Sequence, residues 1–425
     1  MERRHFAGTA AVGLARSPRP AAAACAETAN RILMVAPQPF YQDRGTPIAL
    51  RHVLEALVDL GYEVDLICFP LGRAIDLAGV HHQPVSNPLG FRSIPIGFSL
   101  KKLFLDAILL ARACGQLRRH TYSCVHAVEE AAYLMWLPCR LSRVPLVYDM
   151  QSSIPDQVRA LRFWRTRPMQ RVLRWLEGWL VRRADYVVAS AGLRQRVQAL
   201  GRAAPHREWH FPAGSTLAQA KPDACERADR CDLIRRQLEI LGSAQVVVYS
   251  GNFEPYQGVP LLLAALPLVL RAAPHSVLVL VGAADQHQIE ATYAALAPSL
   301  REHLRIVARQ PRDQVERFLL AADVLVSPRI SGDNAPLKIF DYLSAARPIV
   351  ATDVTAHRAV LQDDEALLVE PTPEALAQGI LRLLQDDQLA RRMAGASAAR
   401  REWLGWPAFL AEVDQIYGSL EGRSR

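Results

Sequence analysis

The sequence predicts an α/β protein built from two Rossmann-like domains that face each other across a central cleft. Short apolar runs, of the kind that form buried parallel strands, alternate with helical patterns from about residue 31 to residue 420. A polar, charged segment at 216–243 interrupts this alternation near its middle. Because 425 residues exceed what one small core usually organises, we assign the two series of strands to two domains.

The first domain is expected over residues 31–215. Its first strand is the apolar run RILMVAP at 31–37, and a helical pattern from Pro47 to Leu60 ends at Gly61, before the strand EVDLICF. Later apolar runs, with helical stretches between them, lie at 123–128, 144–150 and 184–190. This alternation is typical of a doubly wound parallel sheet, which binds ligands at the carboxyl ends of its strands.

The second domain is expected over residues 244–390, after a linker at 216–243. Its strands are more regular than those of the first domain, and they lie at 245–251, 276–282, 304–308, 323–328, 348–353 and 366–371. Residues 391–425 are predicted to form C-terminal helices. Among them, WPAFLAEVDQIYGSL at 406–420 is an amphipathic helix that we expect to pack back on the first domain.

Residues 1–30 are left out of the fold. Arg3 and Arg4 resemble a twin-arginine signal only faintly, because the apolar stretch after them is short and is broken by RSPRP. We expect a disordered extension or a start placed too far upstream. The absence of any run of 18 apolar residues argues against a transmembrane helix. The seven cysteines include no CxxC pair, which is typical of unpaired thiols in the cytoplasm.

The net charge of +8 favours an anionic partner: a phosphorylated small molecule, a membrane surface or nucleic acid. Nucleic acid is disfavoured, because the sequence has neither an aromatic-interleaved RNA motif nor zinc-finger spacing. Two basic segments lie at 99–120 and 157–183, and the second combines eight arginines with Trp164, Trp175 and Trp179. Such helices suit an anionic membrane interface. The alternative is that the tryptophans are core residues and the arginines form a solvated face.

The most informative stretch is SGDNAPLKIFDYLSAARPIVATD at 331–353, which follows a predicted strand. A helix that starts near 334–337 points free backbone N–H groups and the positive end of its dipole into the cleft, where a diphosphate would bind. Asp333 could accept hydrogen bonds from sugar hydroxyls, and Asp341 from the two hydroxyls of a ribose. The alternatives are a helix cap for Asp333 and a solvated helix position for Asp341. The residues expected around the diphosphate are Asn334, Ala335, Pro336 and Leu337.

This stretch resembles the donor-binding signature of retaining GT-B glycosyltransferases of the group 1 / family 4 type. In that signature two acids, usually glutamates, are separated by seven residues and followed by a small-residue helix and G-x-P-V-V-A-T. The two acids of this chain are aspartates, which have a shorter reach. Residues 249–269 resemble the second element of the family and residues 44–67 its N-terminal element, so the resemblance covers most of the chain from about 31 to 420.

The resemblance implies a GT-B fold and the transfer of a sugar, with retention, from a nucleotide-diphosphate sugar to an acceptor hydroxyl. The hydroxyl would attack the front face of the sugar as the nucleotide diphosphate leaves, and the leaving phosphate would take its proton. The protein then supplies positioning and positive charge rather than a nucleophile. We expect no metal ion and no other cofactor, because N–H dipoles and a lysine would hold the diphosphate.

The chain departs from the family at two donor-binding positions. Where the family has an arginine and a lysine that grasp the diphosphate, this sequence has Asn252 and Gln257, neither of which is charged. Lys338 is the best candidate to supply the missing positive charge, with Arg329 and Arg44 as lesser candidates. The alternative is that Lys338 is a surface lysine.

Gly45-Thr46-Pro47 is expected to form a tight turn, an N-cap and a proline at the first helical position, which would offer N–H groups to a phosphate. The resemblance places this glycine against the donor. The alternative is an ordinary helix start.

Two further strand ends of the first domain carry candidate residues. His126, which we expect to end the strand at 123–128, matches a family histidine that contacts the transferred sugar, and Glu129 or Glu130 could join it. The alternative for His126 is a structural role. Asp149 and Gln151 are candidates for the acceptor side. The catalytic residues expected from these arguments are His126, Lys338 and Asp333.

Three functions remain open. The first is a hexosyltransferase in cell-envelope, exopolysaccharide or glycolipid synthesis, located in the cytoplasm or on the inner face of the membrane, where a lipid-linked acceptor would fit. The second is a sugar-nucleotide epimerase or phosphorylase on the same fold, although an epimerase needs acid/base residues near the sugar. The third is a catalytically silent sugar-nucleotide-binding protein, motivated by Asn252 and Gln257. The base pocket is expected near Gly282 and the loop at 309–310.

Overall fold

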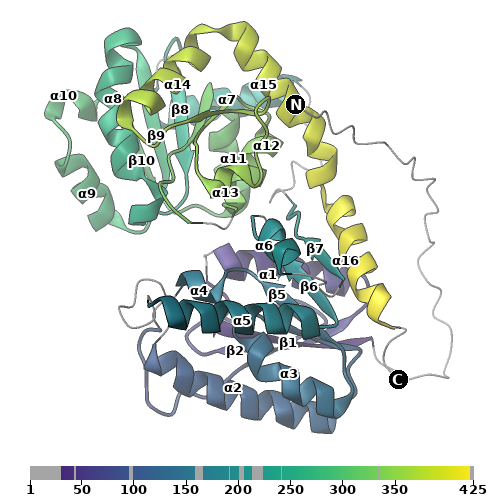
Figure 1. The fold of residues 1–425 in the computed structure, drawn as a ribbon. Helices are drawn as coiled ribbons and strands as arrows, with labels where there is room; N and C mark the ends of the chain where they lie inside the picture. Colours follow the sequence, from purple (N-terminus) through teal and green to yellow (C-terminus); the bar gives the residue numbers. More distant parts are fainter. Residues whose placement is uncertain are drawn as a thin grey trace.

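The computed structural model describes residues 30–42, 45–94, 99–157, 166–190, 192–200, 205–212, 224–240, 242–332 and 335–421. It consists of two α/β halves, each built around a parallel sheet (Figure 1). The two Rossmann-like domains of the sequence prediction are therefore confirmed.

The first sheet has seven strands in the order β3-β2-β1-β4-β5-β6-β7, all paired in parallel. They are β1 (Arg31–Pro39), β2 (Glu63–Phe69), β3 (Val80–Pro84), β4 (Cys124–Val128), β5 (Leu146–Met150), β6 (Tyr186–Ala189) and β7 (His206–Glu208). The sequence prediction missed both edge strands. Edge strand β3 reads VHHQP and β7 only HRE, so neither has the apolar run that marks a buried strand.

The helices of the first half cover both faces of this sheet. They are α1 (Gly45–Asp59), α2 (Leu100–Arg119), α3 (Ala131–Ser142), α4 (Ile154–Gln157), α5 (Arg167–Arg183) and α6 (Arg194–Ala199). Helix α1 starts at Gly45 rather than at Pro47, so Thr46 lies inside the first turn and is not the N-cap that the sequence suggested. A proline in the first turn is tolerated because its missing N–H has no intrahelical partner there.

The second sheet has six parallel strands in the order β10-β9-β8-β11-β12-β13. They are β8 (Gln245–Ser250), β9 (Ser276–Ala283), β10 (Leu304–Ala308), β11 (Val324–Ser327), β12 (Ile349–Thr352) and β13 (Ala366–Val369), and each overlaps a predicted strand. The helices are α7 (Ala224–Gln237), α8 (Val259–Ala272), α9 (Gln286–Ala294), α10 (Pro298–Arg301), α11 (Arg312–Leu320), α12 (Leu337–Ala345), α13 (Thr355–Arg358), α14 (Pro373–Gln385), α15 (Asp387–Arg400) and α16 (Trp406–Glu421).

Part of the segment 216–243, which we interpreted as a linker, is helix α7. Its Ile234 is buried in the core of the second half, in the same cluster as Phe318 of α11. The helix ACERADRCDLIRRQ carries many charged and few large apolar side chains, so its hydrophobic period is weak in the sequence.

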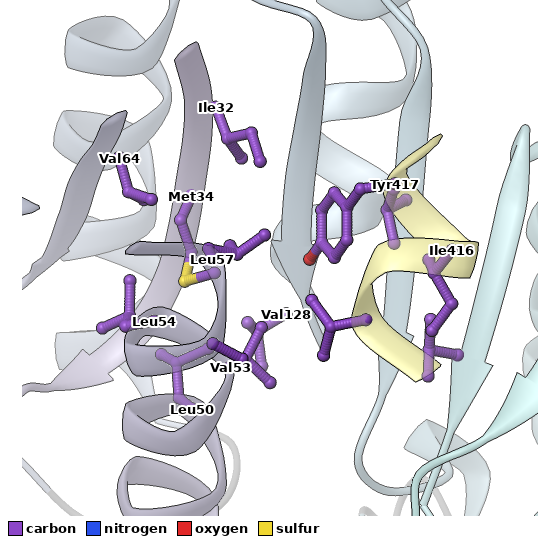
Figure 2. Close-up of a cluster of buried hydrophobic side chains, with 14 of the residues drawn as sticks. Ile32, Met34, Leu50, Val53, Leu54, Leu57, Val64, Val128, Ile416 and Tyr417 are labelled. Carbon is purple, nitrogen blue, oxygen red and sulfur yellow. The ribbon is translucent and has the colours of Figure 1, made fainter. Parts of the chain in front are cut away.

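Helix α16 leaves the second half and packs against the first. Its Phe409, Val413, Ile416 and Tyr417 are buried in one hydrophobic cluster with α1 and β1. Figure 2 shows Ile416 and Tyr417 on the same side of the sheet as Val128, next to the α1 residues. Trp406 Nε1 also donates a hydrogen bond to Asp59 at the end of α1, at 2.9 Å. The last helix therefore connects the two halves.

One helical stretch of the described chain, Pro255–Ala272, is long and apolar enough to cross a membrane by length and composition alone. Its Leu262, Leu266 and Val269 lie in the core cluster of the second half, together with Leu376 and Ile380 of α14. A buried core helix satisfies the same criterion.

Candidate active site

A cleft of about 2170 Å³ is lined by loops from both halves. Most of these loops follow strands, so the cleft lies at the carboxyl edges of the two sheets, where doubly wound folds bind ligands. The predicted residues that line it are Gly45, Gln151, Asn252, Gln257, Arg329, Ala335, Pro336, Leu337, Lys338 and Asp341. The loops expected around the donor base also line it, through Gly282, Arg309 and Gln310. Asp333, Asn334 and Arg44 lie outside the described residues.

His126 does not reach this cleft. The prediction that it ends its strand is wrong, because β4 continues to Val128 and His126 pairs with Met34 and Val147 inside the sheet. Its side chain is fully buried. The ring Nε2 lies 3.2 Å from Asp149 Oδ2, and Nδ1 lies 2.7 Å from the hydroxyl of Tyr417 on α16. A ring held on both nitrogens inside the core cannot contact a sugar, so the structural alternative applies.

Asp149 is likewise buried and acts through a neighbour rather than on a substrate. Its Oδ1 accepts hydrogen bonds from Gln151 Nε2 at 2.7 Å and from Trp209 Nε1 at 3.2 Å. Of the two residues predicted for the acceptor side, only Gln151 lines the cleft. Asp149 fixes the orientation of the Gln151 amide.

Polar side chains at the carboxyl ends of β4, β5 and β6 line the first-half wall of the cleft. Glu129 follows β4, Ser152 lies two residues after β5, and Ser190 follows β6. Neither serine was named as a candidate from the sequence, although the segment 148–157, which contains Ser152, was expected to line the acceptor side. Glu129 was predicted without a definite role. The signal was present, since each is a polar residue within two positions of the end of an apolar run.

Lys338 is the second residue of α12, and its amine points into enclosed space. The Nζ atom is buried and has no hydrogen-bond partner in the part of the chain that the structure describes, and it lies 4.1 Å from the centre of the Tyr249 ring. Burial lowers the pKa of this amine well below its usual value, and the positive charge of Arg329 adds to the shift. The alternative of a surface lysine is therefore wrong for the amine itself.

Arg329 follows β11 and is held by its surroundings. Its Nε donates to the carbonyl of Ser331 at 2.7 Å, and its guanidinium lies 5.3 Å from the Tyr256 ring centre. Thr352 Oγ1 donates to the Arg329 carbonyl, and Thr352 in turn contacts the buried His357. This network fixes the backbone that carries the arginine.

Glycines let the loops of the second half come close together. Gly282 has φ of 125°, and a Cβ built on it would lie 2.3 Å from the carbonyl oxygen of Gly251. Only glycine allows this approach, which joins the ends of β8 and β9 beside the cleft.

The two uncharged residues predicted to bind the donor, Asn252 and Gln257, lie in this region. Asn252 offers no cation, and its backbone carbonyl accepts a hydrogen bond from the Tyr249 hydroxyl at 2.6 Å. Gln257 is buried, and no described residue bonds its Oε1. A buried amine and a buried amide oxygen, neither bonded by a described residue, point to a polar ligand that would satisfy them.

Two facing Rossmann-like domains, with a cleft at the carboxyl ends of both sheets, define the GT-B fold. Residues 44–214 match the model of the glycosyl transferase 4-like domain, and residues 244–386 match that of glycosyl transferases group 1. The chain therefore belongs to the group 1 / family 4 glycosyltransferases and is an enzyme of that class.

Its curated relatives include proteins named for inositol-containing acceptors. Phosphatidyl-myo-inositol mannosyltransferase of Mycobacterium tuberculosis (strain ATCC 25618 / H37Rv) is 25% identical over 402 residues, covering 92% of this chain and 97% of the relative. D-inositol 3-phosphate glycosyltransferase of Kineococcus radiotolerans is 28% identical over 304 residues, covering 66% of this chain and 68% of the relative.

Solved structures share the fold. Sucrose-phosphate synthase from Thermosynechococcus elongatus superposes with a TM-score of 0.71 at 20% identity, covering 92% of this chain and 98% of that protein. The Anabaena protein HepE in complex with UDP-glucose superposes with a TM-score of 0.65 at 17% identity, covering 92% and 99%.

Proposed function

We propose that the protein is a retaining hexosyltransferase that moves a sugar from a nucleotide-diphosphate sugar to a hydroxyl group of an inositol-containing acceptor. The observation that carries this proposal is Lys338, which lines the cleft at the start of α12 and whose buried amine has no hydrogen-bond partner among the described residues. A diphosphate there would receive a charge-assisted hydrogen bond from the lysine and would meet the free N–H groups of the helix start.

Lys338 and Arg329 replace the charge that Asn252 and Gln257 lack. Both cations line the second-half wall of the cleft, and the charge of each acts on the other. A leaving diphosphate between them would be stabilised in the transition state without a divalent cation. We therefore propose a metal-independent reaction, in which the configuration at the anomeric carbon is retained.

The acceptor is proposed from the relatives. The two relatives named above bear the names of a phosphatidyl-myo-inositol and a D-inositol 3-phosphate enzyme, so both names specify a phosphorylated inositol. A phosphorylated acceptor also agrees with the net charge of +8.

A lipid-linked acceptor would place the first half at a membrane surface. Helices α2 and α3 expose Leu100 and Leu141, at 79% and 76%, and α5 exposes Trp175 at 60%. Trp179 instead packs on Trp136, with ring centres 4.6 Å apart, so the α5 tryptophans divide between surface and interior. Trp164 lies outside the described residues. We propose peripheral binding to the inner face of the membrane, from the cytoplasm.

Sedimentation with vesicles tests the membrane proposal. We expect the protein to sediment with vesicles that contain anionic phosphatidylinositol and to stay in solution with neutral phosphatidylcholine vesicles. Trp175→Ala should weaken sedimentation, whereas replacement of the packed Trp179 would act only through folding. Equal partition between the two vesicle types would contradict the proposal.

Nucleotide binding and donor turnover test the enzymatic proposal. Titration calorimetry with UDP, GDP and ADP identifies the base, and the corresponding glucose or mannose donors are then incubated with phosphatidylinositol vesicles, with and without EDTA. Lys338→Met, which keeps the length but removes the amine, should weaken nucleotide binding about ten- to hundredfold. Proton NMR of the product should give the same anomeric configuration as the donor.

The alternative against which the proposal is tested is a member of the family that has lost catalysis, because Asn252 and Gln257 are both uncharged. It predicts tight nucleotide binding with no transfer and no donor hydrolysis at any pH. Restoring the family residues with Asn252→Arg and Gln257→Lys would then create turnover, whereas the leading proposal expects turnover before any substitution.

A further inference from the structure

The carboxyl end of β4 presents the side chain of Glu129 to the cleft. Glu129 is the first residue after the strand, and its N–H donates to the carbonyl of Asp149 at 2.9 Å. Its φ is 50°, a conformation that few residues other than glycine adopt. The backbone is therefore held in a turn that places this carboxyl group on the cleft wall opposite the one that carries Lys338.

A serine from the neighbouring strand end holds the carboxyl group. Ser152 Oγ donates to Glu129 Oε1 at 2.7 Å, and both side chains line the cleft. Because β4 and β5 are adjacent in the sheet, the register that pairs Val128 with Asp149 brings these two loops together. The pairing of β4 with β5 therefore fixes the contact between Ser152 and Glu129.

The charged groups around Glu129 come from three elements. Glu130 is next to it and forms an ion pair with Lys102 of α2, Asp106 follows one turn later on α2, and Asp149 lies on β5. Burial raises the pKa of Glu129 to about 7, and the negative charge of Glu130 adds to this shift. Lys102, which is paired with Glu130, opposes this shift only in part.

We propose that Glu129, positioned by Ser152, binds the acceptor hydroxyl that attacks the sugar; this inference rests on the proposed function. An ionised carboxylate accepts a hydrogen bond from the hydroxyl and turns one oxygen lone pair toward the anomeric carbon. The new bond joins that oxygen to the anomeric carbon while the bond from carbon to phosphate oxygen breaks. As this bond breaks, the hydroxyl proton turns from Glu129 to an oxygen of the leaving phosphate and is transferred to it, so Glu129 ends the cycle unchanged.

The test compares transfer with donor binding in Glu129→Gln. With phosphatidylinositol vesicles as the acceptor and the donor saturating, kcat/KM for the acceptor should fall about ten- to hundredfold, the usual range for a lost hydrogen bond to a charged group. The Kd for UDP or GDP should stay within about twofold, because Glu129 is on the other wall. The rate of transfer by the wild type should rise as pH rises through about 7. This rising limb of the pH–rate profile should be absent from the variant.

Two variants keep the test decisive. Ser152→Ala should move the limb to higher pH, because the serine hydrogen bond favours the ionised form of Glu129. Asp106→Asn is the matched control: burial also raises the pKa of Asp106 to about 7, yet this residue does not line the cleft, so the limb should remain. If Glu129→Gln does not fold, as judged by its melting temperature, the shift in Ser152→Ala decides.

Three outcomes would overturn the inference. Transfer by Glu129→Gln within threefold of wild type overturns it alone, and so does a limb that disappears in Asp106→Asn. Nucleotide binding by the wild type without any transfer overturns the proposed function together with it.

Discussion

The two walls of the cleft are built differently. On the second-half wall, Lys338, Arg329 and the start of α12 come from one continuous stretch after β11. On the first-half wall, the groups come from three separate strand ends, and Gln151 is held by Asp149. Asp149 in turn contacts His126, which is bonded by the hydroxyl of Tyr417, 291 residues later in the chain. The wall that would bind the donor is encoded locally, whereas the opposite wall depends on long-range packing.

The walls also differ in how far their polar groups are satisfied. On the first-half side, Asp149 is bound by Gln151 and Trp209, and Glu129 by Ser152. On the second-half side, the amine of Lys338 has no hydrogen-bond partner within the described ranges. The polar groups of the first-half wall are therefore in place before any ligand binds. The second-half wall carries a buried amine that an anionic ligand would satisfy.

Acid should weaken the second half through His357, the largest effect that we expect. His357 Nδ1 lies 2.7 Å from the Thr352 carbonyl and Nε2 lies 2.8 Å from Ser327 Oγ, and burial lowers its pKa from 6.5 to about 4. Between pH 6.5 and pH 4, His357 binds a proton in the unfolded chain but stays unprotonated in the folded protein. Stability present above pH 6.5 is therefore lost, up to about 3 kcal/mol by the linkage relation.

Urea titrations at pH 7.5 and pH 5 measure this loss in the wild type and in His357→Gln. The variant should be less stable at pH 7.5 but should lose less on acidification. Burial also lowers the pKa of His82 in the first half, so the difference between the two proteins, and not the wild-type curve alone, reports on His357. Equal acid sensitivity in both proteins would contradict the assignment.

Lys338→Met should stabilise the protein without ligand while it weakens nucleotide binding. Burial lowers the pKa of the amine, so at neutral pH the folded protein either keeps it uncharged or holds an unpaired charge, and both are unfavourable. Removing an unsatisfied buried group should raise the free energy of unfolding by about 1–3 kcal/mol. Differential scanning calorimetry without nucleotide tests the expected gain in stability, and the same measurement with nucleotide tests the expected loss of binding.

The outcome distinguishes a functional amine from a structural one. If Lys338→Met melts at a lower temperature than the wild type, the lysine stabilises the fold and its amine is not an unsatisfied group kept for an anionic ligand. If nucleotide raises the melting temperature of the variant as much as that of the wild type, the amine does not bind the diphosphate.

The difference between the walls also explains what the sequence could predict. Strands β8 to β13 are short apolar runs with clear boundaries, so the hydrophobic period was enough to predict them. The stretch at 331–353, which we predict to bind the donor, directly follows β11 and was therefore easy to place at the cleft. The edge strands β3 and β7 and the helix α7 carry few apolar residues, and their structure depends on neighbours that a local pattern does not contain.

His126 shows why the first-half wall was harder. The sequence suggests a histidine at a strand end, but whether the ring faces the cleft or the core depends on where β4 ends and on what covers its face. Tyr417 of α16 covers the ring of His126, and the sequence around residue 126 does not predict that contact. Glu129, three positions later, reaches the cleft instead.

Two buried tyrosines give the smallest but most direct test of the comparison. Tyr417 bonds His126 in the first half at 2.7 Å, and in the second half the hydroxyl of Tyr342 accepts from the N–H of Ser250 at 2.8 Å and donates to the carbonyl of Val326 at 3.2 Å. Replacing either tyrosine by phenylalanine removes one hydroxyl and should cost about 1 kcal/mol of stability.

Their effects on ligand binding should differ. Tyr342→Phe releases the end of β8 next to Gly251, which lines the cleft, so nucleotide affinity should fall several-fold. Tyr417→Phe leaves that wall intact and should not change nucleotide affinity, although it loosens the His126–Asp149 pair that positions Gln151 and should therefore raise the acceptor KM. Calorimetric titration of both variants with the same nucleotide, followed by acceptor kinetics, decides the matter. Equal losses of nucleotide affinity would mean that the two walls are coupled through α16 and do not act separately.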